Sequence, residues 1–157
     1  MQKISINEYN QVYGKYSMGG CAILSDPNKV YDKIDEFELT ESYKKSIQMD
    51  LERAGIVLNQ LKEYIVLDVG TGRQTIAFHQ LGAKKIHHYD ISKDNVNRMN
   101  QYISSNSLHN KLESICVDLV KASLPFSYFD FVYLHGIVQH YSHTGQGLSN
   151  CCFWIYG

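Results

Sequence analysis

The feature that most constrains the fold is a short apolar run that ends in a glycine-rich turn. The run covers residues 64–69, includes the β-branched pair Ile65-Val66, and is followed at once by Gly70-Thr71-Gly72. A continuous apolar run of this length is typical of a strand that is buried on both faces, as in a parallel sheet. Glycines leave room for a ligand to approach the backbone closely. The segment therefore predicts a parallel strand with a ligand site at its end.

Helix and strand patterns alternate along the chain from residue 40 onward. A helix is predicted from Thr40, whose side chain can cap it, with an apolar face formed by Tyr43, Ile47, Leu51, Ala54, Leu58 and Leu61. Further helices are predicted over 75–81, after the cap Ser92, and over 148–155, and further strands over 85–90, 114–118 and 129–135. The alternation predicts an α/β fold, a doubly wound and mainly parallel sheet with helices on both faces.

The length of 157 residues fits one domain, which we divide into two parts. Residues 1–39 show no sustained period and are predicted to be an irregular lead segment, in which Tyr13 and Tyr16 are candidates for a lid. Residues 40–157 are predicted to be the core. Since a doubly wound sheet usually has five or more strands, and the chain ends where a fifth would begin, we expect a core that is truncated at its C-terminus.

Composition limits the partners and the compartment of the protein. Fifteen Lys and Arg residues against sixteen Asp and Glu residues give a net charge of −1, so no charge excess indicates a nucleic acid or an anionic membrane as partner. The sequence lacks both a run of about 18 apolar residues and the apolar core of a signal peptide. We therefore expect a soluble, cytoplasmic protein. The four cysteines form no CxxC pair and are expected to be reduced.

Three of the four predicted strands end at or near an aspartate. Asp68 precedes the glycine turn, Asp90 follows 22 residues later, and Asp118 another 28 residues later. Ligands of open parallel sheets bind beyond the carboxyl ends of the strands. The two oxygens of a carboxylate at Asp90 match the vicinal diol of a ribose, and Asp118 is placed to accept from the exocyclic amine of an adenine. Each aspartate has an alternative role as a turn or helix cap, and the two glycines as a plain tight turn.

These segments resemble the successive motifs of class I S-adenosylmethionine-dependent methyltransferases. The resemblance covers residues 60 to 143 and rests on the stretches 66–72, 89–92, 116–118 and 129–133, with Val138-Gln139-His140 behind them. It implies a Rossmann-like fold with the methionine part of the cofactor against the glycine turn, the ribose at Asp90 and the adenine at Asp118. The implied cofactor-binding residues are Asp68, Gly70, Thr71, Gly72, Asp90, Ile91, Asp118, Leu119 and His135. Gln74 stands where the family pattern often has a third glycine.

The chemistry of the strand ends favours S-adenosylmethionine over a dinucleotide. Thr75 occupies the third glycine position of a GxGxxG pyrophosphate loop, and three carboxylates would repel the phosphates of NAD. S-Adenosylmethionine carries an ammonium and a sulfonium, which acceptor groups suit. Two alternatives stay open, a non-catalytic methyltransferase-like nucleoside-binding module completed by another subunit and a fragment of an NAD-dependent oxidoreductase.

Candidates for the general base follow the fourth predicted strand. Among His135, His140 and His143 we choose His140 as the catalytic residue, because histidine titrates near neutral pH and the stretch around it resembles the family motif. No metal site is expected, since His87 and His88 must point to opposite faces of a strand. The sequence does not identify the methyl acceptor, for which a small molecule is favoured over a macromolecule. An exposed sheet edge is a candidate surface for oligomer formation.

Overall fold

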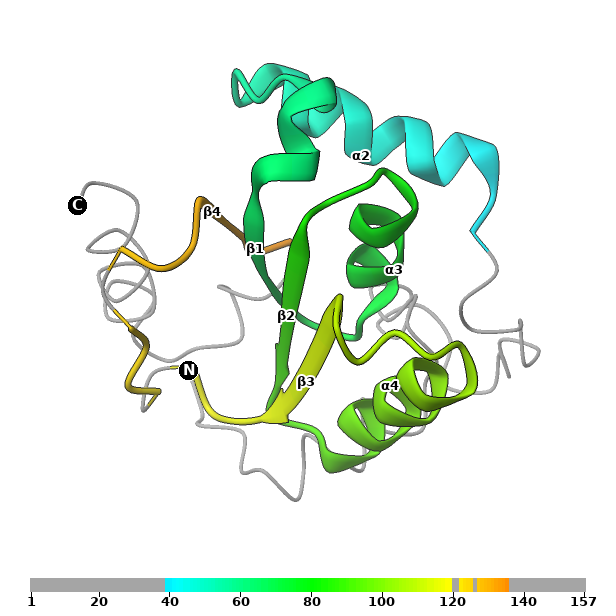
Figure 1. Ribbon diagram of the computed structural model, residues 1–157, viewed down its shortest axis with the longest axis vertical. Coiled ribbons are helices and arrows are strands. Elements are labelled where there is room, and N and C mark those ends of the chain that lie inside the picture. Colours follow the sequence, from blue (N-terminus) through cyan, green and yellow to red (C-terminus); the bar gives the residue numbers. More distant parts are fainter. Residues whose placement is uncertain (1–38, 120–121, 126, 136–157) are drawn as a thin grey trace, which may run out of the picture.

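A computed structural model describes residues 39–119, 122–125 and 127–135 of the chain (Figure 1). These residues contain one four-stranded sheet in which every pair of neighbours is parallel, in the order β3-β2-β1-β4. The strands are β1 (Ile65–Val69), β2 (Lys85–Asp90), β3 (Leu112–Cys116) and β4 (Phe131–Tyr133). The predicted parallel α/β sheet is therefore confirmed. β3 begins two residues before the predicted strand and β4 is shorter than predicted.

The strand register divides one face of the sheet into an apolar row and a polar row. Val66 of β1 lies beside Ile86 of β2 and Phe131 of β4, and all three side chains belong to one buried apolar cluster. Two residues further along the strands, the register aligns four polar side chains, Tyr133, Asp68, His88 and Ser114. Since residues two apart in a strand share a face, this polar row lies on the same face, nearer the carboxyl ends.

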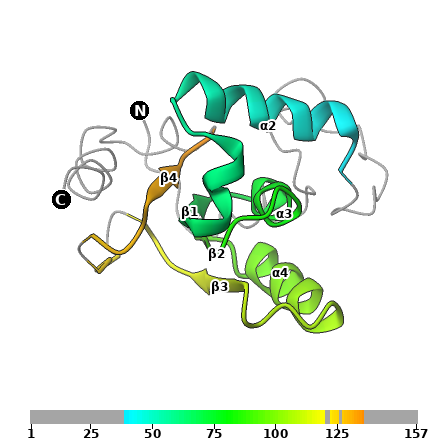
Figure 2. The ribbon, with the colours of Figure 1, turned by 45° about the horizontal axis from the view of Figure 1, so that its top comes forward.

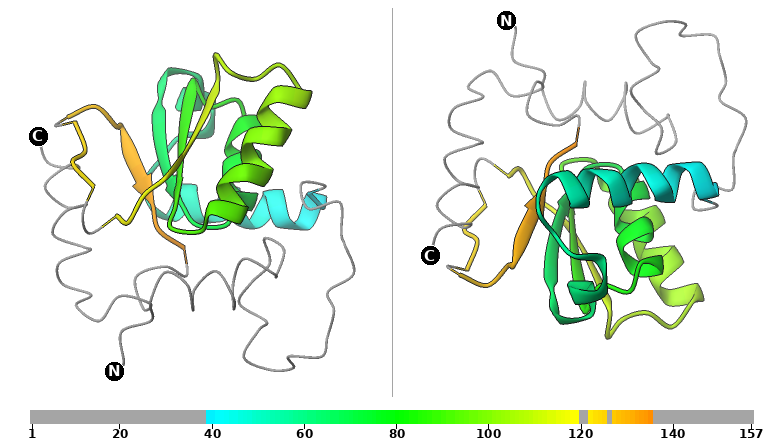
Figure 3. Two further views of the ribbon diagram at one scale, coloured as in Figure 1. Left: turned by 90° about the horizontal axis from the view of Figure 1, so that it is seen from below. Right: turned by 90° about the horizontal axis from the view of Figure 1, so that it is seen from above.

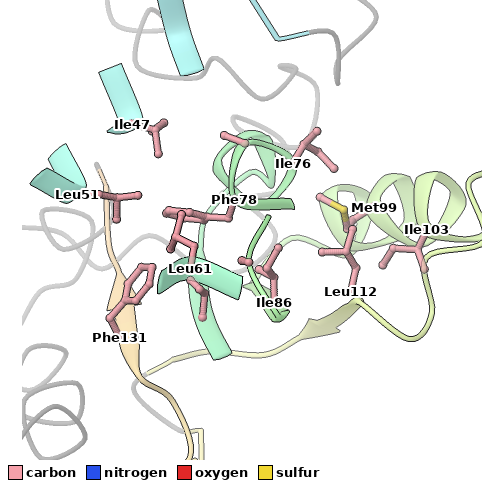
Figure 4. Close-up of a cluster of buried hydrophobic side chains, with 13 residues drawn as sticks. Ile47, Leu51, Leu61, Ile76, Phe78, Ile86, Met99, Ile103, Leu112 and Phe131 are labelled. Carbon is pink, nitrogen blue, oxygen red and sulfur yellow. The ribbon is translucent and has the colours of Figure 1, made fainter. Parts of the chain in front are cut away.

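The helices of the described residues pack on that face of the sheet. They are α2 (Glu41–Arg53), α3 (Arg73–Gln80) and α4 (Lys93–Ser105). Figure 3 shows α3 and α4 on one side of the strands, and Figure 2 shows α2 lying across α3. At the centre, the ring of Phe78 meets that of Phe131 edge-on, with centroids 5.6 Å apart (Figure 4). The ring of Tyr133 also meets that of Phe78 edge-on, with centroids 5.1 Å apart.

The opposite face packs against the chain that follows β3. Leu67, Val69 and Tyr89 form a second buried cluster there with Leu119 and Phe129. Helices on both faces were expected from the sequence, and the helix predicted over 148–155 lies outside the described residues. Within the described ranges, no helix has the length and apolarity needed to span a membrane.

The first predicted helix ends earlier than its apolar spacing indicates. Gly55 has φ +78°, its N–H donates to the Glu52 carbonyl, and the N–H of Ile56 donates to the Leu51 carbonyl. This pair of hydrogen bonds is a Schellman motif, which stops α2 at Arg53. A 3₁₀ helix, η2 (Leu58–Glu63), then returns the chain to the core. The prediction of one continuous helix to residue 61 was therefore wrong.

The starts of α2 and α4 agree with the sequence. The Thr40 side chain accepts from the N–H of Tyr43, and the Ser92 side chain accepts from the N–H of Asn95. The apolar face predicted for the latter helix is buried. At the end of α3, Gly82 has φ +94° and forms a second Schellman motif, as its position after the helix predicted.

Candidate functional site

The candidate site lies at the carboxyl edge of the sheet, where β1 stands between β2 and β4. The chain leaves β1 toward β2 and later returns to the opposite side of β1, so this is the point at which the strand order reverses. Open α/β sheets bind ligands outside the carboxyl ends of the strands at such a point. The glycine turn follows β1 there, Asp90 closes β2, and His135 lies just beyond β4.

Asp68 lies beneath the glycine turn and is fully buried. Its Oδ2 accepts a 2.5 Å hydrogen bond from Thr75 Oγ1 in α3, whereas Oδ1 has no hydrogen-bond partner within the described part of the chain. Burial raises the pKa of Asp68 to about 7, although the hydrogen bonds from Thr75 oppose that shift. The hydrogen bond between Asp68 and Thr75 therefore joins the end of β1 to α3 beneath the glycine turn. The expected contact of Asp68 with the cofactor stays a prediction.

The two glycines of the turn adopt backbone conformations that other residues avoid. Gly70 has φ +147° and Gly72, the N-cap of α3, has φ +99°. Both glycines are therefore required by the backbone, and the close approach of a ligand to them stays a prediction. The N–H of Gly70 donates to the carbonyl of Tyr89 (3.1 Å), which ties the turn to β2. Thr71, between the two glycines, is half-buried.

His88 is a buried residue of this site that the sequence did not identify. Its Nε2 lies 2.6 Å from the carbonyl oxygen of Gly70, and its Nδ1 lies 2.8 Å from Ser114 Oγ on β3. Burial lowers the pKa of the ring to about 4, so the imidazole is neutral at physiological pH. Two adjacent histidines in a strand indicate that one of them faces each side, but the sequence does not supply the register that places Gly70 above His88.

Asp90 stands level with the glycine turn and also binds the segment at the start of α4. Its Oδ1 accepts from the N–H of Ser92 (2.6 Å), and its Oδ2 accepts from Asn95 Nδ2 (3.0 Å). Burial raises the pKa of Asp90 to about 6, against the lowering effect of these donors. Of the turn or capping role that the sequence left open, the turn contact is thus present, and Ser92 is the cap. Because a carboxylate has about four acceptor sites, the hydrogen bonds from Ser92, Asn95 and the Ile91 backbone leave capacity for a further donor such as a ribose hydroxyl.

The residues expected around the adenine separate into two environments. Asp118 is half-buried, and Ile91 is half-buried with its carbonyl 3.6 Å from the thiol of Cys116. Leu119 is 1% exposed and packs in the apolar cluster on the opposite face. The structure therefore assigns Leu119 a packing role, and the adenine contacts of this segment stay predictions.

The β4 side of the edge carries a tyrosine and a histidine. The Tyr133 hydroxyl donates to Asp50 Oδ2 of α2 (3.1 Å) and lies 3.4 Å from His135 Nδ1. Burial, together with the hydrogen bond to Asp50, holds the pKa of Tyr133 above its usual range. His135 is exposed, and His140 lies outside the described residues.

On the other face of β2, His87 belongs to a separate cluster. Its Nδ1 lies 3.1 Å from Glu113 Oε2, and its ring meets those of Tyr128 and Phe129 edge-on. His87 and His88 thus point to opposite faces, as the strand period predicted. In the ranges that the structure describes, no three His, Cys, Asp or Glu side chains are grouped as metal ligands.

Comparison with solved structures finds the same fold in several methyltransferases. A proposed S-adenosyl-L-methionine-dependent methyltransferase from Methanococcus maripaludis superposes with a TM-score of 0.59 at 18% identity, over 72% of this chain and 50% of that chain. The magnesium protoporphyrin IX methyltransferase ChlM from Synechocystis PCC 6803, solved with bound S-adenosylmethionine, gives a TM-score of 0.58 at 22% identity, over 73% and 54%. The [4+2]-cyclase SpnF gives 0.53 at 18% identity, over 69% and 42%.

These comparisons show the fold, and the sequence comparison shows the family. The chain spans about half the length of the solved structures that it matches. A comparison with curated proteins finds no match. The methyltransferase domain family matches residues 66–153, more than half of the chain and including the glycine turn, Asp90 and Asp118. The chain therefore belongs to the methyltransferase domain family, with the Rossmann-like fold of S-adenosylmethionine-dependent methyltransferases.

Proposed function

We propose that this chain binds S-adenosylmethionine at the carboxyl edge of its sheet and serves methyl transfer to an acceptor molecule. The observation that carries the proposal is the convergence of three features on one edge: the glycine turn after β1, the carboxylate of Asp90 and the half-buried Asp118. ChlM, which has the same fold, is solved with S-adenosylmethionine bound.

The residues present suit that cofactor. Asp90 has acceptor capacity left for a ribose hydroxyl, and the buried Oδ1 of Asp68 lacks a donor in the described part of the chain. The bound cofactor would supply a methyl group activated by its sulfonium. The chain's own contribution is to hold that group in line with the acceptor and to exclude water.

The proposal assigns proton removal from the acceptor to His140, which lies outside the described residues. The base is needed when the attacking atom is a hydroxyl oxygen or a protonated amine. His135 is the described histidine nearest to this part of the chain, and its contact with Tyr133 supports a role in shaping the acceptor side. We propose a small molecule as the acceptor. A His140→Ala variant with unchanged turnover would remove His140 as the base.

Calorimetry on the 157-residue chain tests cofactor binding directly. S-Adenosylhomocysteine and NAD are titrated in parallel, and we expect heat of binding with the former alone. Binding of NAD alone would overturn the proposal and favour an oxidoreductase. Release of S-adenosylhomocysteine in the presence of hydroxyl and amine acceptors then tests methyl transfer.

Variants of Asp90 and Asn95 separate cofactor binding from the hydrogen bonds that join Asp90 to the start of α4. Asp90→Ala removes the carboxylate and these hydrogen bonds, and we expect the affinity for S-adenosylhomocysteine to fall about 10- to 100-fold, as for the loss of hydrogen bonds to a charged group. Asn95→Ala is the matched control, because it removes one of these hydrogen bonds and keeps the carboxylate. We expect it to lower the stability while the affinity changes less than about threefold. An Asp90→Ala variant that binds like the parent would remove the ribose assignment.

A further inference from the structure

The buried polar row beneath the glycine turn contains a hydrogen-bonded chain that links three segments. Ser114 lies on β3, His88 on β2, and Gly70 in the turn after β1. The two contacts of the His88 ring, 2.8 Å to Ser114 Oγ and 2.6 Å to the Gly70 oxygen, join them in that order. His88 has no exposed surface, so its ring nitrogens form hydrogen bonds with these two partners and not with solvent.

The chemistry of the partners fixes the direction of each hydrogen bond. A carbonyl oxygen only accepts, so Nε2 must carry the ring proton and donate it to Gly70. The ring is neutral, since burial lowers its pKa to about 4, and Nδ1 is therefore an acceptor for the Ser114 hydroxyl. The Nε2–H tautomer is thus selected by the Gly70 carbonyl, and the Ser114 hydroxyl, which can donate or accept, is compatible with it.

This donor orients one peptide group of the turn. The N–H of Gly70 is already held by the carbonyl of Tyr89, so His88 supplies the second contact from β2 to the same glycine. In a trans peptide the C=O and the following N–H point in opposite directions, and the described residues contain no cis peptide. When the Gly70 carbonyl is drawn to His88, the N–H of Thr71 must point away from the ring.

We propose that His88, itself held by Ser114, is a positioning residue that sets the peptide plane between Gly70 and Thr71 and thereby shapes the glycine turn for the cofactor. The proposal rests on the proposed function for the identity of that ligand. Glycine alone does not supply this order, because its backbone reaches many conformations at φ > 0. The buried donor selects one of them.

Three variants test the assignment by binding. His88→Leu removes the donor, and we expect the dissociation constant of S-adenosylhomocysteine to rise about tenfold, as for one lost hydrogen bond that orders a site. His88→Gln keeps an N–H donor near the position of Nε2 and is expected to restore the affinity to within about threefold of the parent. Ser114→Ala releases the ring and is expected to weaken binding by about threefold or more.

His87→Leu is the matched control for these variants. It changes the same residue type in the same strand, but on the opposite face, where the ring contacts Glu113, Tyr128 and Phe129. We expect it to lower the melting temperature while leaving the affinity within about twofold of the parent. A folded His88→Leu variant that binds like the parent, or a His87→Leu variant that loses as much affinity, would overturn the proposal.

A measurement without cofactor separates this proposal from the proposed function. In nitrogen NMR of the parent at neutral pH, we expect the His88 ring to carry its proton on Nε2. We also expect the amide resonances of Gly70 and Thr71 to shift in His88→Leu and to return toward their parent positions in His88→Gln. These results stand even when the parent binds no S-adenosylhomocysteine, a result that would overturn the proposed function alone. A proton on Nδ1, or unmoved amide resonances, would overturn the positioning role. If His88→Leu does not fold, the positioning role is tested by the ring resonances of the parent and by the affinities of His88→Gln and Ser114→Ala.

Discussion

At the scale of single residues, two neighbouring side chains of the polar row respond to burial in opposite ways. Asp68 and His88 stand side by side on β1 and β2, and neither is exposed. Burial disfavours the charged form of each, so the pKa of Asp68 rises to about 7 and the pKa of His88 falls to about 4. Asp68 and His88 are therefore both neutral at mildly acidic pH, and Asp68 ionises as the pH rises.

The pH dependence of stability should report the burial of Asp68. The folded chain holds the Asp68 proton up to about pH 7, whereas the unfolded chain releases it near the usual pKa of 3.8. The resulting stabilisation is complete below about pH 4 and is lost as the pH rises through 7. Asp68→Asn cannot titrate. We expect the free energy of unfolding of the parent, relative to this variant, to fall between pH 4 and pH 7 by at most about 4 kcal/mol.

Urea unfolding of both proteins at several pH values measures this difference. Asp90 also titrates in this range, and its charge helps to raise the pKa of Asp68, so the comparison measures the burial of Asp68 together with this repulsion. Parallel stability curves for the parent and Asp68→Asn across this range would contradict the raised pKa.

At the scale of elements, the apolar period predicted where the helices begin better than where they end. The side-chain caps Thr40 and Ser92 were visible in the sequence because a hydroxyl before an apolar period has a specific partner at the third amide. The end of α2 was missed, since Ala54, Leu58 and Leu61 continue the helical spacing past Gly55. Ala54 is exposed, and the other two reach the core from η2. Spacing alone did not reveal the change of direction.

Replacement of Gly55 should reveal the strain at that helix end. A Cβ at this position would meet no atom within 4 Å, so the effect of a substitution is backbone strain at φ +78°. We expect Gly55→Ala to lower the free energy of unfolding by about 1 kcal/mol, which corresponds to a melting temperature lower by about 3 °C. Gly55→Asn, which tolerates this conformation better, should lose less. Equal melting temperatures for Gly55→Ala and the parent in a thermal scan would argue against the Schellman end.

At the scale of the whole molecule, the sheet order creates the site. β1 lies between β2 and β4, so residues from three parts of the chain meet at one edge. β3 and β4 are the outer strands of the described sheet, and the expected oligomer through an exposed edge stays a prediction. The lead segment 1–39 and the acceptor side around His140 lie almost wholly outside the described residues and stay predictions as well.

Ligand binding at that edge should stabilise the whole fold. A ligand that binds only the folded state at 100 times its dissociation constant adds about 2.7 kcal/mol to the free energy of unfolding. We expect saturating S-adenosylhomocysteine to raise the melting temperature of the chain by several degrees, whereas NAD at the same concentration leaves it unchanged. Differential scanning fluorimetry measures both, and an equal rise with the two ligands would show that the site does not discriminate against phosphates.

The sequence by itself determined the parallel α/β sheet, the glycine turn and the strand-end aspartates, because buried strands, caps and tight turns depend on residues that are near one another in the chain. Only the tertiary structure decided what these groups contact. The register sets Asp90 level with the turn and Asp68 two residues beneath it, beside His88, although the sequence predicted both aspartates at the ends of their strands; β1 ends one residue later, at Val69. That difference arises from hydrogen bonds between strands about 20 residues apart, which no local pattern encodes.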